Sequence, residues 1–213
     1  MRRDLALAVG GRLVADAIDV VRRYAGLDWS GGGPEVWAFQ YFDRTPAVFD
    51  DVVTPVDVLC AASMHPGLSR HDLAFFVDQR AGLSAWLAGA DPNVTLWDAD
   101  ERTLRHVESL TSFEPAVTLS LLTKVLHRKR PLLIPLLDRH VVDFYRPVTG
   151  ERRPVLAWPG LLEAIRADLG SPEQRLLVQT AAEISGAMTR VGDADVTIGS
   201  LRFIDIAIWM SAR

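Results

Sequence analysis

A helix start signal that recurs along the chain places the strongest constraint on the fold. Thr54-Pro55-Val56-Asp57 combines an N-cap threonine, a proline at the first helical position and an acid at the third. Related capping patterns occur at three further places: Ser69 to Asp72, Asp98 to Glu101, and Ser171 to Gln174. Since the segments after these signals read as helices and little reads as strand, the sequence predicts an all-α fold of about nine helices.

The length of 213 residues and an apolar content of 49% are enough to bury a sizeable core. They predict one helical domain over residues 1–213, built as a single unit or as two closely packed lobes. At the N-terminus, apolar residues at helical spacing predict a long helix over residues 4–24, although the Gly10-Gly11 pair weakens its first half.

Several functional classes are disfavoured by the residues present. Asp4, Arg12 and Asp16 interrupt the first apolar run, so neither a signal peptide nor a membrane span is predicted. The single cysteine, Cys60, cannot form an internal disulfide, which favours a reducing compartment and therefore the cytoplasm. The five histidines are scattered without a set of metal-ligand spacings, and we predict neither a metal nor a cofactor.

Charge is distributed unevenly along the chain. Residues 43–108 carry eleven acidic and five basic side chains, whereas residues 127–153 carry seven basic and three acidic ones. The net charge of the chain is -4. A basic balance over the whole domain, which is typical of nucleic-acid-binding proteins, is absent.

The segment TKVLHRKRPLLIPLLDRHVVDFY, residues 123–145, holds the candidate functional residues. Arg128, Lys129 and Arg130 lie at the predicted end of a helix, where cations are favoured by the helix dipole and cap free carbonyl groups. Asp138 stands where a carboxylate can cap the next helix. One interpretation of this segment is therefore purely structural.

The same segment resembles the second half of the helix-hairpin-helix DNA glycosylase fold, over about residues 105–145. The resemblance rests on a helix that ends in basic residues, a short apolar link with proline, and an Asp that opens a helix in D-x-H-V. It implies that Asp138 stabilises a developing cationic sugar or activates water, and that Lys124 attacks the sugar. The residues that would contact DNA are Arg128, Lys129, Arg130, Arg139 and His140.

Two features depart from that family. Its hairpin is a glycine-rich turn that holds a DNA phosphate, but LTSFEPAVT at the equivalent position contains no glycine and places Glu114 at its centre. Lys124 lies about two and a half helical turns beyond Pro115, so it is poorly placed to act as the attacking lysine of that family.

A second resemblance spans nearly the whole chain. TPVDVLCA, TKVLHRKRPLLIPLLDRHV and LRFIDIAIWM are similar to segments of an uncharacterised actinomycete family of unknown function. In the last segment, Asp205 borders an apolar stripe, so we expect it to be drawn inward and to need a cationic partner. The candidates considered for that partner are Arg128, Arg130 and Arg139.

Two hypotheses therefore remain open, and neither settles whether the protein is an enzyme. In the first, the chain is a nucleic-acid-associated protein of DNA-glycosylase-like architecture, with DNA as its partner. In the second, it is a non-enzymatic interaction or small-anion-binding helical module, in which Asp138 and the basic residues have structural roles. The basic segment favours the first hypothesis, whereas the net charge, the missing glycine hairpin and Glu114 favour the second. Of the two we favour the first, as a statement of ancestry rather than of catalysis.

Overall fold

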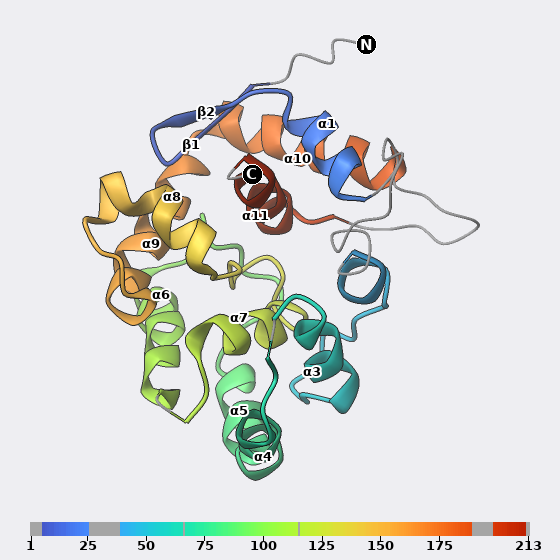
Figure 1. Ribbon diagram of the computed structural model, residues 1–213. Coiled ribbons are helices and arrows are strands. Elements are labelled where there is room, and N and C mark those ends of the chain that lie inside the picture. The colour runs from blue at the N-terminus through green and yellow to red at the C-terminus, as the bar shows by residue number, and fades with distance from the viewer. Residues whose placement is uncertain (1–5, 26–38, 66, 115, 189–197, 212–213) are drawn as a thin grey trace.

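The computed structural model in Figure 1 describes residues 6–25, 39–65, 67–114, 116–188 and 198–211. Within these ranges the protein is mostly helical, which confirms the predicted class; ten α-helices are accompanied by one small hairpin. The elements are β1 (Leu7–Val9), β2 (Arg12–Val14), α1 (Ala17–Tyr24), the π-turn η1 (Phe39–Asp43), α3 (Pro55–Ala62), α4 (Arg70–Asp78), α5 (Arg80–Ala88), α6 (Glu101–Glu108), the 3-10 turn η2 (Ser109–Phe113), α7 (Leu119–His127), α8 (Arg139–Thr149), α9 (Pro154–Asp168), α10 (Pro172–Met188) and α11 (Ser200–Ser211).

The prediction of one helix over residues 4–24 is wrong in its first half. Strands β1 and β2 pair antiparallel, with Leu7 opposite Val14, and only α1 is helical. Gly10 and Gly11 form the turn with φ of 57° and 72°, the left-handed values that a two-residue hairpin turn of this kind requires. The backbone N–H of Gly10 donates to the carboxylate of Asp168 at 2.7 Å, which fixes the hairpin to the end of α9.

Local capping explains where several helices begin. Thr54 and Asp57 form a complete capping box at α3, and Ser69 and Asp72 form another at α4, as predicted. The N-cap of α6 lies two residues later than predicted, because Asp100 rather than Asp98 accepts the hydrogen bond from the backbone N–H of Thr103.

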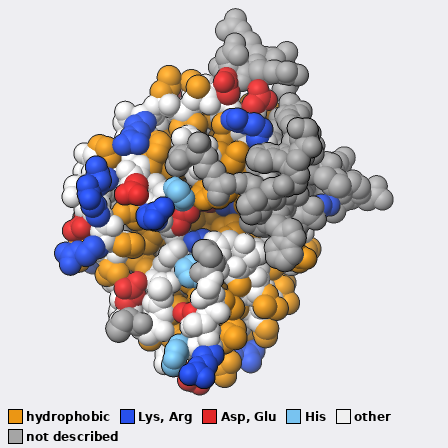
Figure 2. Space-filling model, in the orientation of Figure 1, with side chains coloured by type: hydrophobic (Ala, Val, Ile, Leu, Met, Phe, Trp, Pro, Cys, Tyr) orange, Lys and Arg blue, Asp and Glu red, His pale blue; other side chains and the backbone are white. Residues whose placement is uncertain are grey.

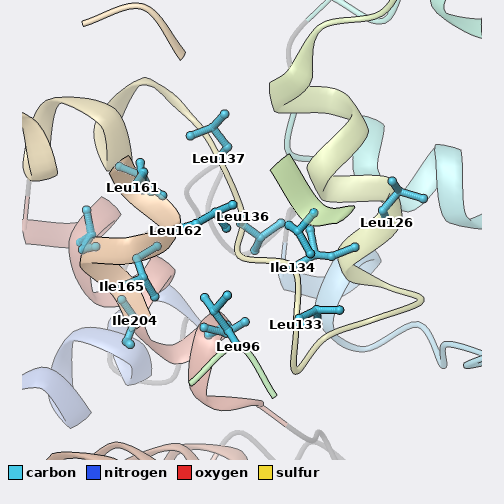
Figure 3. Packing of buried hydrophobic residues seen from close by; sticks show 14 of the residues in the cluster. Leu96, Leu126, Leu133, Ile134, Leu136, Leu137, Leu161, Leu162, Ile165 and Ile204 are labelled. Carbon is cyan, nitrogen blue, oxygen red and sulfur yellow. The ribbon is translucent and has the colours of Figure 1, made fainter. Parts of the chain in front are cut away.

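Helix α7 and the link that follows it, residues 131–138, lie in the centre of the core. Every leucine and valine of α7 is fully buried, and so are four apolar side chains of the link. Figure 3 shows the link side chains between Leu161, Leu162 and Ile165 of α9 on one side and Leu126 of α7 on the other. The apolar run between the two prolines is therefore a core segment.

The remaining helices surround this centre. Helix α11 packs against α1, α10 and α8, while α3 packs against α7 (Figure 1). The helices α4 and α5 lie beyond α7 at the opposite end of the molecule from α1. Among the helices that the structure describes, none has the length and apolar character needed to cross a membrane.

Candidate functional site

Asp57 on α3 collects two of the predicted DNA-binding cations. Its carboxylate accepts from Arg128 Nε at 3.2 Å and lies 2.8 Å from Lys129 Nζ, and all three side chains are no more than 3% exposed. Burial alone would raise the pKa of Asp57, but hydrogen bonds from Lys129 and Thr54 hold that pKa below its usual value. This carboxylate is therefore the buried counter-ion of the basic segment.

The segment that precedes α3 supplies the other acceptors. Arg128 donates to the backbone carbonyls of Phe42, Thr45 and Pro46, at 2.8 to 3.3 Å. Lys129 Nζ donates to the carbonyl of Val48 and to the carboxylate of Asp50. Buried cations need this degree of pairing, since an unpaired charge inside a protein costs several kcal/mol.

Arg130 points into a different part of the interior. Its guanidinium donates to the carbonyls of Leu87, in the last turn of α5, and of Ala90, just beyond that helix. It also donates to the carbonyl of Asp50 and the carboxylate of Asp51. Only 1% of the residue is exposed. Five N–H donors in a fixed fork allow one arginine to tie these two segments together.

The basic residues predicted to meet DNA thus have different environments. Arg128, Lys129 and Arg130 are buried and bonded to protein acceptors, so in this structure they do not present a cationic surface to phosphate. Arg139 is exposed, and His140 is half-buried with its ring 6.3 Å from that of Trp209. The expected gathering of the five side chains at one surface is not observed.

The two predicted catalytic residues, by contrast, lie near each other. Lys124 is buried on α7, and its Nζ donates to the carbonyl of Leu137 at 3.4 Å, directly before Asp138. Burial lowers the pKa of Lys124, while the charges of Asp138 and Asp205 act in the opposite direction. Asp138 is half-buried, and one of its oxygens caps α8 by accepting from Val141 N at 2.9 Å.

Ser120 completes this group, and sequence reasoning did not identify it. Its Oγ lies 2.9 Å from Lys124 Nζ, one helical turn away, and its side chain is half-buried. Ser120 is the second residue of α7, where backbone N–H groups have no partner inside the helix. Figure 2 shows that basic, acidic and histidine side chains are interspersed with apolar ones on the visible face of the molecule.

Arg202 is the centre of a second buried ionic cluster, close enough to Lys124 for its charge to lower the pKa of that residue. Its guanidinium binds both oxygens of Asp43 at 2.6 and 2.7 Å, and it also contacts the carboxylate of Asp205 and the hydroxyl of Tyr24. The expectation that Asp205 is drawn inward is correct. Its partner is Arg202, one turn earlier on α11, rather than Arg128, Arg130 or Arg139; the first two are already bonded elsewhere.

A small pocket adjoins this cluster. Its walls are apolar, and Asp205 is the one ionisable group among its lining residues, which are Pro135, Leu136, Val141, Ile165, Leu201, Ile204, Asp205 and Ile208. The space holds roughly one water molecule. Burial raises the pKa of Asp205 from 3.8 to about 7, against the lowering effect of the Arg202 charge.

The raised pKa of Asp205 predicts a pH dependence of stability. The folded state binds the proton more tightly than the unfolded state, so this contribution is complete below pH 4 and is lost as the pH rises toward 7. The groups acting on Asp205 are Arg202, Lys124 and Asp138. Relative to Asp205→Asn, the wild type should lose up to about 1.4 kcal/mol per pH unit between pH 5 and 7.

Urea titrations of both proteins at half-unit pH steps measure this difference directly. The comparison with the asparagine variant matters because it cancels the titration of all groups that the two proteins share; Asp57, with its lowered pKa, changes its contribution only at pH values below this interval. Parallel curves for the two proteins would show that Asp205 stays ionised throughout.

The described residues contain no group of three or more histidine, cysteine, aspartate and glutamate side chains arranged to share a metal ion. Cys60, the single cysteine of the chain, is buried.

The fold and these contacts define a mostly helical protein with two buried ionic clusters. A model of a family of unknown function, DUF6308, matches residues 17–212, and the chain belongs to that family. The predicted membership of a family without a known activity is thereby confirmed. Comparisons with curated proteins and with solved structures found no match.

Proposed function

We propose that this protein is a small-ligand-binding helical module, and that its ligand presents an anionic group such as a carboxylate or phosphate to Lys124 and Ser120. The observation that carries this proposal is the donor capacity left at the two residues. Lys124 uses two of its three N–H donors, on Ser120 Oγ and the carbonyl of Leu137. The backbone N–H of Ser120 has no acceptor among the residues described.

The contrast with the basic segment supports the same conclusion. Arg128, Lys129 and Arg130 are engaged by carboxylates and carbonyls of the protein itself, which supports a structural role for them. Releasing them to bind phosphate would leave Asp57 buried without its partners, at a cost of several kcal/mol. In the same way, Asp138 acts as the N-cap of α8.

The proposal is tested by thermal shift with inorganic phosphate and with acetate. A ligand that binds only the folded state stabilises it by about 2.7 kcal/mol at one hundred times its Kd. We expect a saturable rise in Tm for the wild type and none for Lys124→Met. Arg139→Ala is the matched control, because it removes an exposed cation of the same stretch and should respond like the wild type.

DNA binding is measured in parallel, by fluorescence anisotropy with duplex and single-stranded oligonucleotides. We expect no binding at low salt, since the cations that would neutralise phosphates are already paired. A binding constant that falls steeply with salt in the wild type but not in Arg139→Ala would contradict the proposal. So would an absence of any phosphate or acetate effect on Tm.

One observation favours a second candidate. Asp138 and Lys124, the pair implied by the resemblance to helix-hairpin-helix DNA glycosylases, lie close enough for the charge of Asp138 to oppose the lowering of the Lys124 pKa. A glycosylase-like protein would use them on a flipped nucleotide. Base release from damaged DNA by the wild type, absent in Asp138→Asn at unchanged Tm, is the result that would favour this candidate. For either candidate we keep the cytoplasm as the expected compartment.

A further inference from the structure

The contact between Ser120 and Lys124 has the geometry of a nucleophile and its base. The two side chains lie on one face of α7, and Ser120 Oγ is 2.9 Å from Lys124 Nζ. A base activates a hydroxyl nucleophile across a hydrogen bond of this length. While Lys124 is an ammonium, it donates to Oγ; as a neutral amine, it accepts the proton of the hydroxyl.

The surroundings of Lys124 favour the neutral amine more than an exposed site would. The residue is 3% exposed, and burial lowers its pKa. The charges of Asp138 and Asp205 oppose this effect without cancelling it. Ser120 is half-buried and is therefore more accessible to solvent than Lys124.

A third component lies at the start of the same helix. Thr118 caps α7 and accepts from the backbone N–H of Leu121, while Glu114 accepts from that of Leu119 at 2.7 Å. Between them, the N–H of Ser120 bonds to no acceptor in the described structure. A backbone N–H beside a nucleophile, at the positive end of a helix, is suited to stabilise an oxyanion.

We propose that Ser120 and Lys124 form a serine–lysine dyad that hydrolyses small carboxylic esters. The inference rests on the proposed function, because the ester occupies the same donors as the anionic ligand and the carboxylate product is such an anion. Asp138 has one oxygen engaged by Val141, and its cap positions the start of α8 next to the pair.

The reaction balances with water as the only co-reactant. Ser120 Oγ forms a bond to the ester carbonyl carbon while its proton passes to Lys124 Nζ, and the carbonyl oxygen takes the negative charge beside the Ser120 N–H. The carbon–oxygen bond to the alcohol then breaks, and Lys124 returns the proton to the leaving oxygen. Water, deprotonated by Lys124, hydrolyses the acyl-serine to the free acid and restores the hydroxyl.

The test uses p-nitrophenyl acetate and a fluorophosphonate probe on the full chain. We expect one acetyl or phosphonyl group per chain at Ser120, located by peptide mass spectrometry, and a nitrophenol release rate that rises with pH as Lys124 loses its proton. Ser120→Ala should remove the label and lower the rate at least about 100-fold with little change in Tm. Lys124→Met should slow labelling at Ser120 by a similar factor.

The controls separate the dyad from simple surface reactivity and from the proposed function. Ser112 is exposed on η2, so Ser112→Ala should behave like the wild type. Acetyl groups on lysine alone, or no label on a folded wild type, would overturn the dyad. If that happens while phosphate still raises Tm, the dyad fails and the binding proposal stands. Labelling at Ser120 without any effect of phosphate or acetate on Tm would support the dyad and contradict the binding proposal.

Discussion

Replacing Asp57 by alanine should lower the free energy of unfolding by roughly 4 kcal/mol, because the variant leaves Arg128 and Lys129 buried without their shared counter-ion. The same substitution also removes the acid of the α3 capping box, a smaller loss of about 1 kcal/mol that is included in this figure. Urea denaturation monitored by circular dichroism measures the change.

Asp50→Ala is the matched control for Asp57→Ala. Asp50 also binds Lys129, at 3.0 Å, but its side chain is 46% exposed, so water replaces the lost contact. We expect a loss of no more than about 1 kcal/mol for this variant. If the two substitutions cost the same, the pairing inside the core is no stronger than pairing at the surface, and the structural role assigned to the basic segment fails.

Replacing Arg202 by methionine should cost about 3 to 5 kcal/mol near neutral pH, because Asp43 and Asp205 then remain in the core without a cation. The loss should be smaller at pH 5 than at pH 8, since Asp205 is protonated below its pKa of about 7 and an uncharged carboxyl needs the cation less. Chemical denaturation at both pH values gives the two differences.

The exposed pair Arg105 and Glu101 provides the comparison for Arg202. Its side chains are 67% and 86% exposed, and Arg105→Met should change stability by less than about 0.5 kcal/mol at either pH. A loss for Arg202→Met that does not depend on pH would mean that Asp205 keeps its charge even without the arginine.

Part of the fold was predictable because its signals are local. The capping boxes at Thr54 and Ser69, and Asp138 as the N-cap of α8, each involve side chains within three residues of the backbone groups that they bind. The prediction for residues 4–24 failed because it, too, relied on local signals alone. Apolar spacing there was compatible with a helix, but the positive φ angles of Gly10 and Gly11 and the distant acceptor Asp168 favour a hairpin.

The candidate site was predictable only in part. Lys124 and Asp138, the two residues that the resemblance suggested, lie near each other, and the catalytic roles that it implied for them stay a prediction. Ser120 and Arg202 were missed. Ser120 precedes Lys124 by four residues on one helix, and that spacing could have indicated the contact. The pairing of Asp43 with Arg202 joins residues 159 positions apart, for which a single sequence carries no signal.

The amino-acid sequence by itself determined a mostly helical chain and where several of its helices begin. Only the tertiary structure decided that Arg128, Lys129 and Arg130 face inward. A cation at the end of a helix is stable both in water and beside buried acceptors, and its own helix does not distinguish these environments. Asp57 and backbone carbonyls about eighty residues away accept hydrogen bonds from these side chains only once the chain has folded, and these contacts keep the cations in the interior.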